Sequence, residues 1–175
     1  MRGRAALWVA AGLMSALGVV GIGPVGASPG GRPATVQVGR LAPAVAPVTV
    51  SGAPFRLTAV HQPMMITFWA SWCVFCRVEM PSVVRLASQA HGRYRVVAID
   101  VTRLDSVANA RRFAAANHVP SPLLLDPSGR VQAAFLVTVL PTTYFVNAKG
   151  VVVAQVLGAE TYQAMQRHLH QAETL

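Results

Sequence analysis

A pair of cysteines at the start of a helical pattern constrains the fold more than any other feature of this sequence. Cys73 and Cys76 are the only cysteines, and the nearly unbroken apolar run 64–69 precedes them as a buried strand would. A helix that begins at Cys73 brings the two sulfurs within one turn, where they can form a small disulfide. The helix N-terminus favours a thiolate, because its N–H groups lack partners and its dipole is positive there. The spacing therefore indicates a reactive dithiol, in which one thiolate attacks a disulfide and the second thiol releases the product.

Charge and cysteine count narrow the class of protein further. The chain has 15 Lys and Arg against six Asp and Glu, a formal net charge of +9. Such an excess can serve binding to nucleic acid or to an anionic membrane surface. The basic residues are scattered, however, and their longest run, Arg111-Arg112, has no aromatic residues interleaved with it. We therefore expect a generally basic surface near a membrane and no nucleic-acid binding.

Residues 1–27 are expected to form a signal peptide or an N-terminal membrane anchor. Arg2 and Arg4 precede an uncharged and mostly apolar run, and Val25-Gly26-Ala27 offers small residues for cleavage. The run is also close to the ~20 residues that a membrane span needs, so cleavage and anchoring both stay open. Either outcome sends the rest of the chain out of the cytoplasm.

The remaining chain divides into a linker and one domain. Residues 28–50 are rich in Gly, Pro and Ala and are expected to form a linker, with a short edge strand at 47–50. Residues 51–175 alternate between strand and helix patterns and end in a hairpin and a helix, which predicts an α/β fold with a mixed central sheet flanked by helices. The strands are expected at 55–57, 64–69, 95–101, 123–125, 142–146 and 151–157, and the helices from 73, from 105, around 131–136 and at 160–173.

The motif Trp-Ala-Ser-Trp-Cys-x-x-Cys-Arg-x-Glu-Met-Pro resembles the thioredoxin superfamily, and within it the TlpA/ResA-like exported thiol–disulfide oxidoreductases. The resemblance covers about residues 44–170. It includes Pro81, five residues after Cys76, where the family kinks its first helix, and Gly158 after the last strand. It also includes Leu140-Pro141-Thr142-Thr143, where the family has a cis-proline that faces the dithiol. The resemblance implies a thioredoxin-like fold for the domain.

The same resemblance implies roles for individual residues. Cys73 corresponds to the exposed nucleophilic cysteine, and Cys76 to the resolving cysteine one turn deeper. Pro141 corresponds to the cis-proline that holds the backbone of the preceding residue, Leu140, open for substrate pairing. Trp72 corresponds to the exposed tryptophan beside the dithiol, which is expected to contact the substrate.

Two departures from the family pattern concern proton handling and redox potential. Thr67 stands where thioredoxins have a buried carboxylate, and Val74-Phe75 stands where some relatives have a glutamate between the cysteines. Glu79, one turn past Cys76, could supply a structural ion pair or take part in proton transfer, and both interpretations stay open. Val74-Phe75 also lacks the histidine of strong oxidants, which predicts a moderate to low potential and a reductant or exchange role.

The leading interpretation is an extracytoplasmic thiol–disulfide oxidoreductase that exchanges disulfides with protein substrates, more as a reductant than as an oxidant. Its only redox group would be the Cys73–Cys76 pair, with no metal or other cofactor. The resemblance implies apocytochrome c as one client, and a role in general disulfide repair stays equally open. The electron donor would be another dithiol protein, either soluble or embedded in the membrane.

Two other functions stay open. A peroxiredoxin-like peroxide reductase would share the fold, but residues 68–71 lack the Pro-x-x-x-Thr-x-x-Cys context. A copper metallochaperone could use the dithiol, although such carriers tend to space their cysteines by three residues and to add a histidine. The spacing here is two.

Overall fold

The computed structural model describes residues 36–57 and 61–175, so the predicted signal peptide or anchor at 1–27 lies outside the described residues. Within the described residues, one six-stranded sheet has the strand order β1-β4-β3-β2-β5-β6. Its strands are β1 (Val48–Thr49), β2 (Met64–Trp69), β3 (Arg95–Asp100), β4 (Leu124–Leu125), β5 (Thr142–Val146) and β6 (Val152–Leu157). The helices are α1 (Val74–Gln89), α2 (Val107–Asn117), α3 (Arg130–Ala134) and α4 (Tyr162–Thr174), with a short 3₁₀ helix, η1, at Thr102–Leu104.

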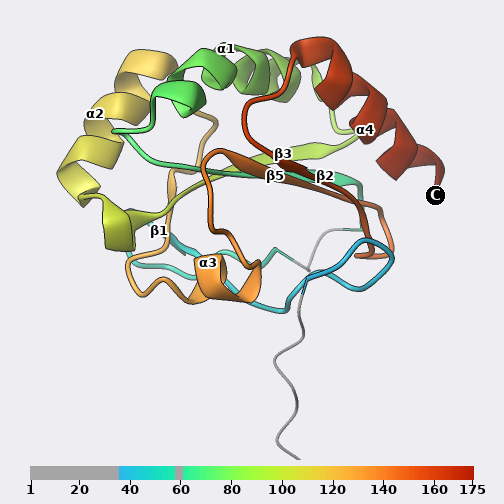
Figure 1. The fold of residues 1–175 in the computed structure, drawn as a ribbon, viewed down its shortest axis with the longest axis horizontal. Coiled ribbons are helices and arrows are strands. Elements are labelled where there is room, and N and C mark those ends of the chain that lie inside the picture. Colours follow the sequence, from blue (N-terminus) through green and yellow to red (C-terminus); the bar gives the residue numbers. More distant parts are fainter. Residues whose placement is uncertain (1–35, 58–60) are drawn as a thin grey trace, which may run out of the picture. The chain divides into compact units, whose positions relative to one another are not determined.

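The sheet is mixed, as predicted. Strands β2, β3 and β4 run parallel to one another, while β5 pairs antiparallel with β2, and β6 antiparallel with β5. Each step from β2 through α1 to β3, and from β3 through α2 to β4, moves the same way across the sheet. Since such crossovers are right-handed, both helices lie on one face. Figure 1 shows α1, α2 and α4 together on that face and α3 on the opposite one.

Strand β2 is the centre of the core, because all six of its residues are buried. Successive side chains point to opposite faces. Trp69 stacks on Phe113 of α2, with ring centres 4.7 Å apart. Phe68 packs instead against Phe135, just after α3, and against Tyr144 of β5. The apolar run before the cysteines is therefore covered on both sides, as expected of a central strand.

Residues 36–50, the described part of the expected linker, pack on the sheet edges. Gly39 N–H donates to the carbonyl of Val152 at 2.8 Å, Ala42 is buried, and Leu41 forms an isolated bridge with Val151. β1 then pairs antiparallel with β4 as the predicted edge strand. The folded unit thus begins at or before Val36, earlier than the expected boundary at residue 51, because backbone hydrogen bonds fix this Pro-rich segment despite its composition.

The strand predicted at 55–57 is wrong. Phe55 N–H does donate to the carbonyl of Pro47 at 2.8 Å, but only Pro54 bridges back to Val48. Proline has no N–H to donate, so the ladder does not continue past this point.

Among residues 36–57 and 61–175, the longest helices are too short or too polar to cross a lipid bilayer.

Candidate active site

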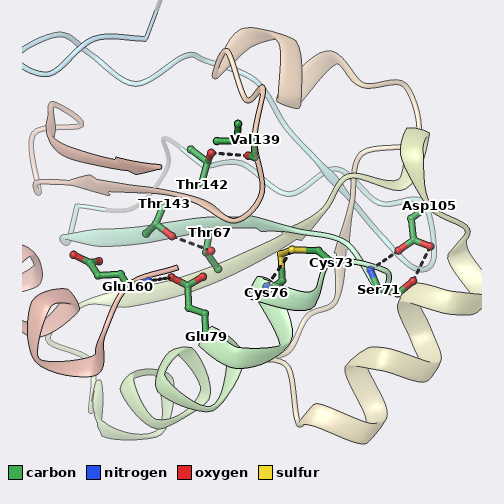
Figure 2. The surroundings of a disulfide bond; sticks show 10 residues. All are labelled: Thr67, Ser71, Cys73, Cys76, Glu79, Asp105, Val139, Thr142, Thr143 and Glu160. Atoms are coloured by element: carbon green, nitrogen blue, oxygen red, sulfur yellow. Dashed lines mark hydrogen bonds between the residues drawn. A yellow bond between two sulfur atoms is a disulfide. The ribbon is translucent and has the colours of Figure 1, made fainter. Parts of the chain in front are cut away.

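The two cysteines form a disulfide at the start of α1 (Figure 2). Cys73 is the N-cap residue, with an extended backbone, and its sulfur accepts a hydrogen bond from the backbone N–H of Cys76 at 3.1 Å. This arrangement fills one of the unpaired N–H positions of the helix end with sulfur, which also favours a thiolate there after reduction. Cys73 is 5% exposed and Cys76 is fully buried. The exposed Cys73 that the resemblance implies is therefore not found in the disulfide form, because its sulfur is bonded to Cys76 and packs against the core; of the two cysteines, Cys73 keeps the small accessible surface.

The loop before β5 faces the same end of the sheet as the disulfide. Thr142, the first residue of β5, pairs with Phe68 near the carboxyl end of β2, and the chain continues from there to Cys73. The Leu140–Pro141 peptide bond is cis, as the resemblance implies, and Thr142 Oγ1 donates to the Val139 carbonyl at 2.8 Å. Within residues 36–57 and 61–175, no hydrogen bond engages the backbone of Leu140. Its N–H and C=O are thus left without a hydrogen-bond partner in these ranges.

Exposed apolar side chains surround the disulfide. Trp72 and Phe75 are 57% and 67% exposed, although Cys73 and Cys76, which follow them directly in the sequence, are buried. The indole N–H of Trp72 donates to the Leu104 carbonyl at 2.8 Å, which holds the ring in place. We call these exposed side chains the apolar rim; its members are Trp72, Val74, Phe75, Val78, Leu104 and Val139.

The loop that leads to Cys73 is held by a carboxylate that the sequence did not single out. Asp105 accepts hydrogen bonds from the N–H of Ser71 at 2.6 Å and from its hydroxyl at 2.9 Å. Burial alone would raise the pKa of Asp105, but the hydrogen bonds from Ser71 and from the N–H of Ser106 outweigh it, so the pKa is lowered. The ionised carboxylate thus fixes the active-site loop onto the segment before α2. Asp105 could be found from sequence only as a helix-capping candidate.

A second carboxylate, Asp100, is fully buried and ends β3 beside Trp69. Burial raises its pKa to about 7, and the nearby charge of Asp105 acts in the same direction, while a hydrogen bond from Thr102 opposes both. Among the atoms that the structure describes, neither Asp100 Oδ2 nor the indole nitrogen of Trp69 has a hydrogen-bond partner. Nothing in the local sequence pattern distinguishes Asp100 from an ordinary strand-end aspartate.

On the inner side of the disulfide, Glu79 is buried in α1 at 3% exposure. Its Oε1 accepts a hydrogen bond from the backbone N–H of Glu160 at 3.1 Å (Figure 2). Burial raises the pKa of Glu79 to about 7; the backbone hydrogen bond from Glu160 and a side-chain hydrogen bond from Thr67 lower it, while the Glu160 charge raises it. The carboxyl group therefore changes protonation near neutral pH, as a proton donor or acceptor for a thiol must.

The ion pair considered for Glu79 is not formed: no Lys, Arg or His of the described chain lies within 4.0 Å of it. Thr67 is buried and its hydroxyl accepts a hydrogen bond from the hydroxyl of Thr143 at 2.9 Å. This part of β2 thus has a hydroxyl where thioredoxins have a carboxylate, and the buried carboxyl group on this side of the disulfide is that of Glu79 in α1. Pro81 lies within α1, where it removes the N–H that would bond the Arg77 carbonyl.

The buried Glu79 connects to a second acidic group. Glu160 Oε1 lies 2.8 Å from Nδ1 of His168, although off the direction of a regular hydrogen bond. Burial raises the pKa of Glu160 against the opposing charge of His168. These contacts join α1 to the start of α4. No spacing in the sequence predicts them, because the residues are far apart along the chain.

Within the described ranges, no group of three or more His, Cys, Asp and Glu side chains is arranged to hold a metal ion.

A thioredoxin-like sheet, a disulfide at the first turn of α1 and a cis-proline at the same edge together define a thiol–disulfide oxidoreductase. The chain belongs to the AhpC/TSA family, whose model matches residues 38–155. Among curated proteins, it is 33% identical to the thioredoxin-like protein YneN of Bacillus subtilis, over 77% of this chain and 79% of that protein. It is 32% identical to the thiol:disulfide interchange protein DsbE of Pseudomonas fluorescens, over 64% and 69% of the two chains.

Solved structures show the same fold. A thiol:disulfide interchange protein of the thioredoxin family from Chlorobium tepidum superposes with a TM-score of 0.67 at 24% identity, covering 80% of this chain and 99% of that one. The exposed lipoprotein thioredoxin Etrx1 of Streptococcus pneumoniae gives a TM-score of 0.63 at 25% identity, covering 72% and 97%. The fold predicted from the cysteine motif is confirmed.

Proposed function

We propose that the protein acts outside the cytoplasm and uses the Cys73–Cys76 dithiol to reduce disulfides in protein substrates. The observation that carries this proposal is the disulfide at the N-terminus of α1, set within an apolar rim and opposite the unpaired backbone of Leu140. A folded or small substrate needs no strand-pairing site, whereas an extended polypeptide does. The relatives named for thiol–disulfide exchange support the same chemistry.

In the proposed reaction, the Cys73 thiolate attacks one sulfur of the substrate disulfide and forms a mixed disulfide, releasing the other substrate sulfur as a thiolate. Cys76, deprotonated next, attacks Cys73 and releases the second substrate sulfur. Two electrons pass from the protein dithiol to the substrate, and the protein returns to its disulfide form. Glu79 is our candidate for the group that accepts the Cys76 proton, because it lies one turn along α1 and its pKa is about 7.

The reductant direction is supported by the residues between the cysteines. Val74 and Phe75 are exposed and uncharged, so neither residue between the cysteines adds a charge to the stabilisation that the Cys73 thiolate has from the Cys76 N–H and the helix dipole. A less stabilised thiolate makes the dithiol a better electron donor. A potential well below the about −120 mV of the strongest oxidants is expected. A value near −120 mV from equilibration with glutathione would contradict the reductant role.

The location and the partners extend the proposal. The segment 1–27 has the composition of a signal peptide or membrane anchor, and one structural relative is an exposed lipoprotein. Residues 28–35 would then tether the domain to that segment. A membrane-embedded dithiol protein would return electrons to Cys73–Cys76, and apocytochrome c is a client of fitting chemistry, since its haem-binding cysteines must be reduced.

A Cys76→Ser variant tests the proposal in cells. It should retain attack by Cys73 but not resolution, so substrates accumulate as mixed disulfides that are separated under non-reducing conditions and identified by mass spectrometry. Cys73→Ser is the matched control that captures nothing. Recovery of extracytoplasmic proteins with paired cysteines supports the proposal, and equal recovery from both variants contradicts it.

Peroxide reduction, the first alternative, is compatible with the AhpC/TSA family but lacks the expected sequence context before Cys73. Stopped-flow mixing of the reduced protein with hydrogen peroxide separates the two functions, since a peroxidase would be oxidised faster by peroxide than by a protein disulfide.

A further inference from the structure

A basic cleft lies between α1 and α2, next to the disulfide. Its volume is about 500 Å³, and it is lined by Ser71, Arg77, Asn109, Arg112, Phe113 and Asn117. We propose that this cleft binds an acidic side chain of the polypeptide substrate, a few residues from the substrate cysteine. The inference rests on the disulfide-exchange function proposed above and adds the chemistry of the substrate.

Two positive charges line the cleft, and neither forms an ion pair within the described ranges. Arg77 and Arg112 are exposed, and neither is within 4.0 Å of an Asp or Glu oxygen in the described part of the chain. The Arg77 guanidinium lies 6.0 Å from the ring centre of Phe113, and Arg112 donates a hydrogen bond to Asn109 Oδ1. Both guanidinium groups are thus held at the cleft by neutral partners, with donors left over for a carboxylate.

The acidic group at the mouth of the cleft is already engaged. Asp105 contacts Ser71 through both carboxylate oxygens and accepts a third hydrogen bond from the N–H of Ser106. It is therefore directed at the active-site loop, and the two arginines remain available to an incoming anion.

The polar side chains of α2 suit a peptide. Asn109 uses its amide oxygen to bond Arg112, and Asn117 uses its amide nitrogen to bond the Phe113 carbonyl at 2.9 Å. The amide nitrogen of Asn109 and the amide oxygen of Asn117 have no hydrogen-bond partner within the described ranges. A peptide lying along α2 would thus meet a donor near one end and an acceptor near the other. Phe113 is buried at 6% exposure, so the cleft has no open aromatic face on which a nucleobase could stack. A polypeptide carboxylate fits better than a nucleotide.

The length of the cleft predicts how far the acidic residue of the substrate lies from the substrate cysteine. The helix rise puts Asn109 and Asn117 about 12 Å apart, the length of about four residues of extended peptide. The cleft begins at Ser71, two residues before Cys73, and Arg77 lies one turn of α1 beyond Cys73. A substrate cysteine bonded to Cys73 would therefore carry an Asp or Glu about two to four positions away.

Two model substrates test this preference. Each is a disulfide-linked homodimer of a short peptide with a single cysteine. The residue three positions from that cysteine is Asp in one substrate and Asn in the other. The reduced protein gives up two electrons and two protons, becomes the Cys73–Cys76 disulfide, and releases two thiol peptides, which chromatography quantifies. The Asp peptide should react about fivefold faster at low ionic strength, and the preference should shrink as salt rises.

Adjacent arginines provide the matched variants. Arg112→Glu should abolish or reverse the preference for Asp, and Arg112→Gln should reduce it. Arg111→Glu makes the same change in net charge but lies in a different groove, with Val50 and Pro122, and should keep the preference. Circular dichroism checks that each variant is folded. Equal rates for both peptides with the wild-type protein, or an equal loss in the two Glu variants, would overturn the cleft assignment alone. Failure to react with either peptide would overturn the disulfide-exchange function as well.

Discussion

The two sides of the disulfide reverse the usual distribution of side chains. Toward solvent, Trp72 and Phe75 expose most of their apolar surface, whereas toward the core Glu79, Thr67 and Thr143 are buried polar groups. Both features lower the free energy of unfolding, because aromatic rings are more stable in the apolar core and carboxyl groups are more stable in water. Under the proposed function, the difference separates two tasks: the outer side would receive a polypeptide, and the inner side would handle a proton. The predictions below change either the boundary between the two sides or one side alone.

The largest effect is expected at the boundary between the two sides. Cys73→Ser should reduce insulin-reduction turnover by about 10³-fold or more, because a serine hydroxyl is not ionised at neutral pH and cannot attack a disulfide. The turbidity of precipitating insulin chains measures it. Cys76→Ser also removes the dithiol, so it should lose turnover as well. The two variants should differ in one respect: Cys76→Ser still forms mixed disulfides and Cys73→Ser does not. Substantial turnover by Cys73→Ser would remove the basis of the proposed function.

On the inner side, Glu79→Gln should change how stability depends on pH. The folded pKa of Glu79 is about 7 against a reference value of 4.5. Between these values the unfolded chain loses the proton while the folded protein keeps it, so the free energy of unfolding falls as pH rises, by about 3 kcal/mol in total. Below about pH 4.5 and above about pH 7, this group adds no slope.

The Gln variant should lack that part of the slope and gain stability relative to the wild type at pH 8. Urea unfolding of the oxidised proteins at several pH values measures the difference. Glu173→Gln, a partly exposed position on α4, is the control that should follow the wild type. Parallel curves for Glu79→Gln and the wild type would show that Glu79 ionises normally. Asp100 adds a slope of the same sign and is unchanged in all three proteins.

On the outer side, Phe75→Ser should lower kcat/KM for a protein disulfide by about 10-fold, since the ring would lose contact with the substrate. Its effect on the free energy of unfolding should stay within about 0.5 kcal/mol, because the side chain is already exposed. Leu41→Ser, similarly exposed beside Val151 at the far end of the hairpin, should leave kcat/KM unchanged. A large loss of stability in Phe75→Ser would mean that the rim serves the fold.

The outer side could be predicted from sequence because its signals are local. The spacing of Cys73 and Cys76, the apolar run before them and the Leu140-Pro141 motif each lie within a few residues, and together they placed the disulfide, α1 and the cis-proline. The boundary expected at residue 51 was less successful, because composition alone cannot reveal that residues 39–42 hydrogen-bond to the β5–β6 hairpin.

The inner side depends on pairs that are distant in sequence. Ser71 meets Asp105 across 34 residues, and Glu79 meets Glu160 across 81. No periodic pattern connects such positions, since they are brought together by strand register and helix packing. The ion pair considered for Glu79 illustrates the limit: the residue type was noticed, but its neighbours could be identified only in the folded chain.

The smallest effect expected here tests whether the buried hydroxyl pair is a unit. Thr67→Val leaves the Thr143 hydroxyl without its partner and also removes the hydrogen bond from Thr67 to Glu79, so it should cost about 1–2 kcal/mol of unfolding free energy. Thr143→Val should cost less, because the Thr67 hydroxyl keeps its bond to Glu79. The double variant replaces both hydroxyls with methyl groups of nearly the same shape, so it should cost less than the sum of the two single changes. Urea unfolding of the four proteins gives the coupling energy. Additive losses would mean that the two hydroxyls act independently, and the inner side would then be a set of separate polar groups with Glu79 as its only functional member.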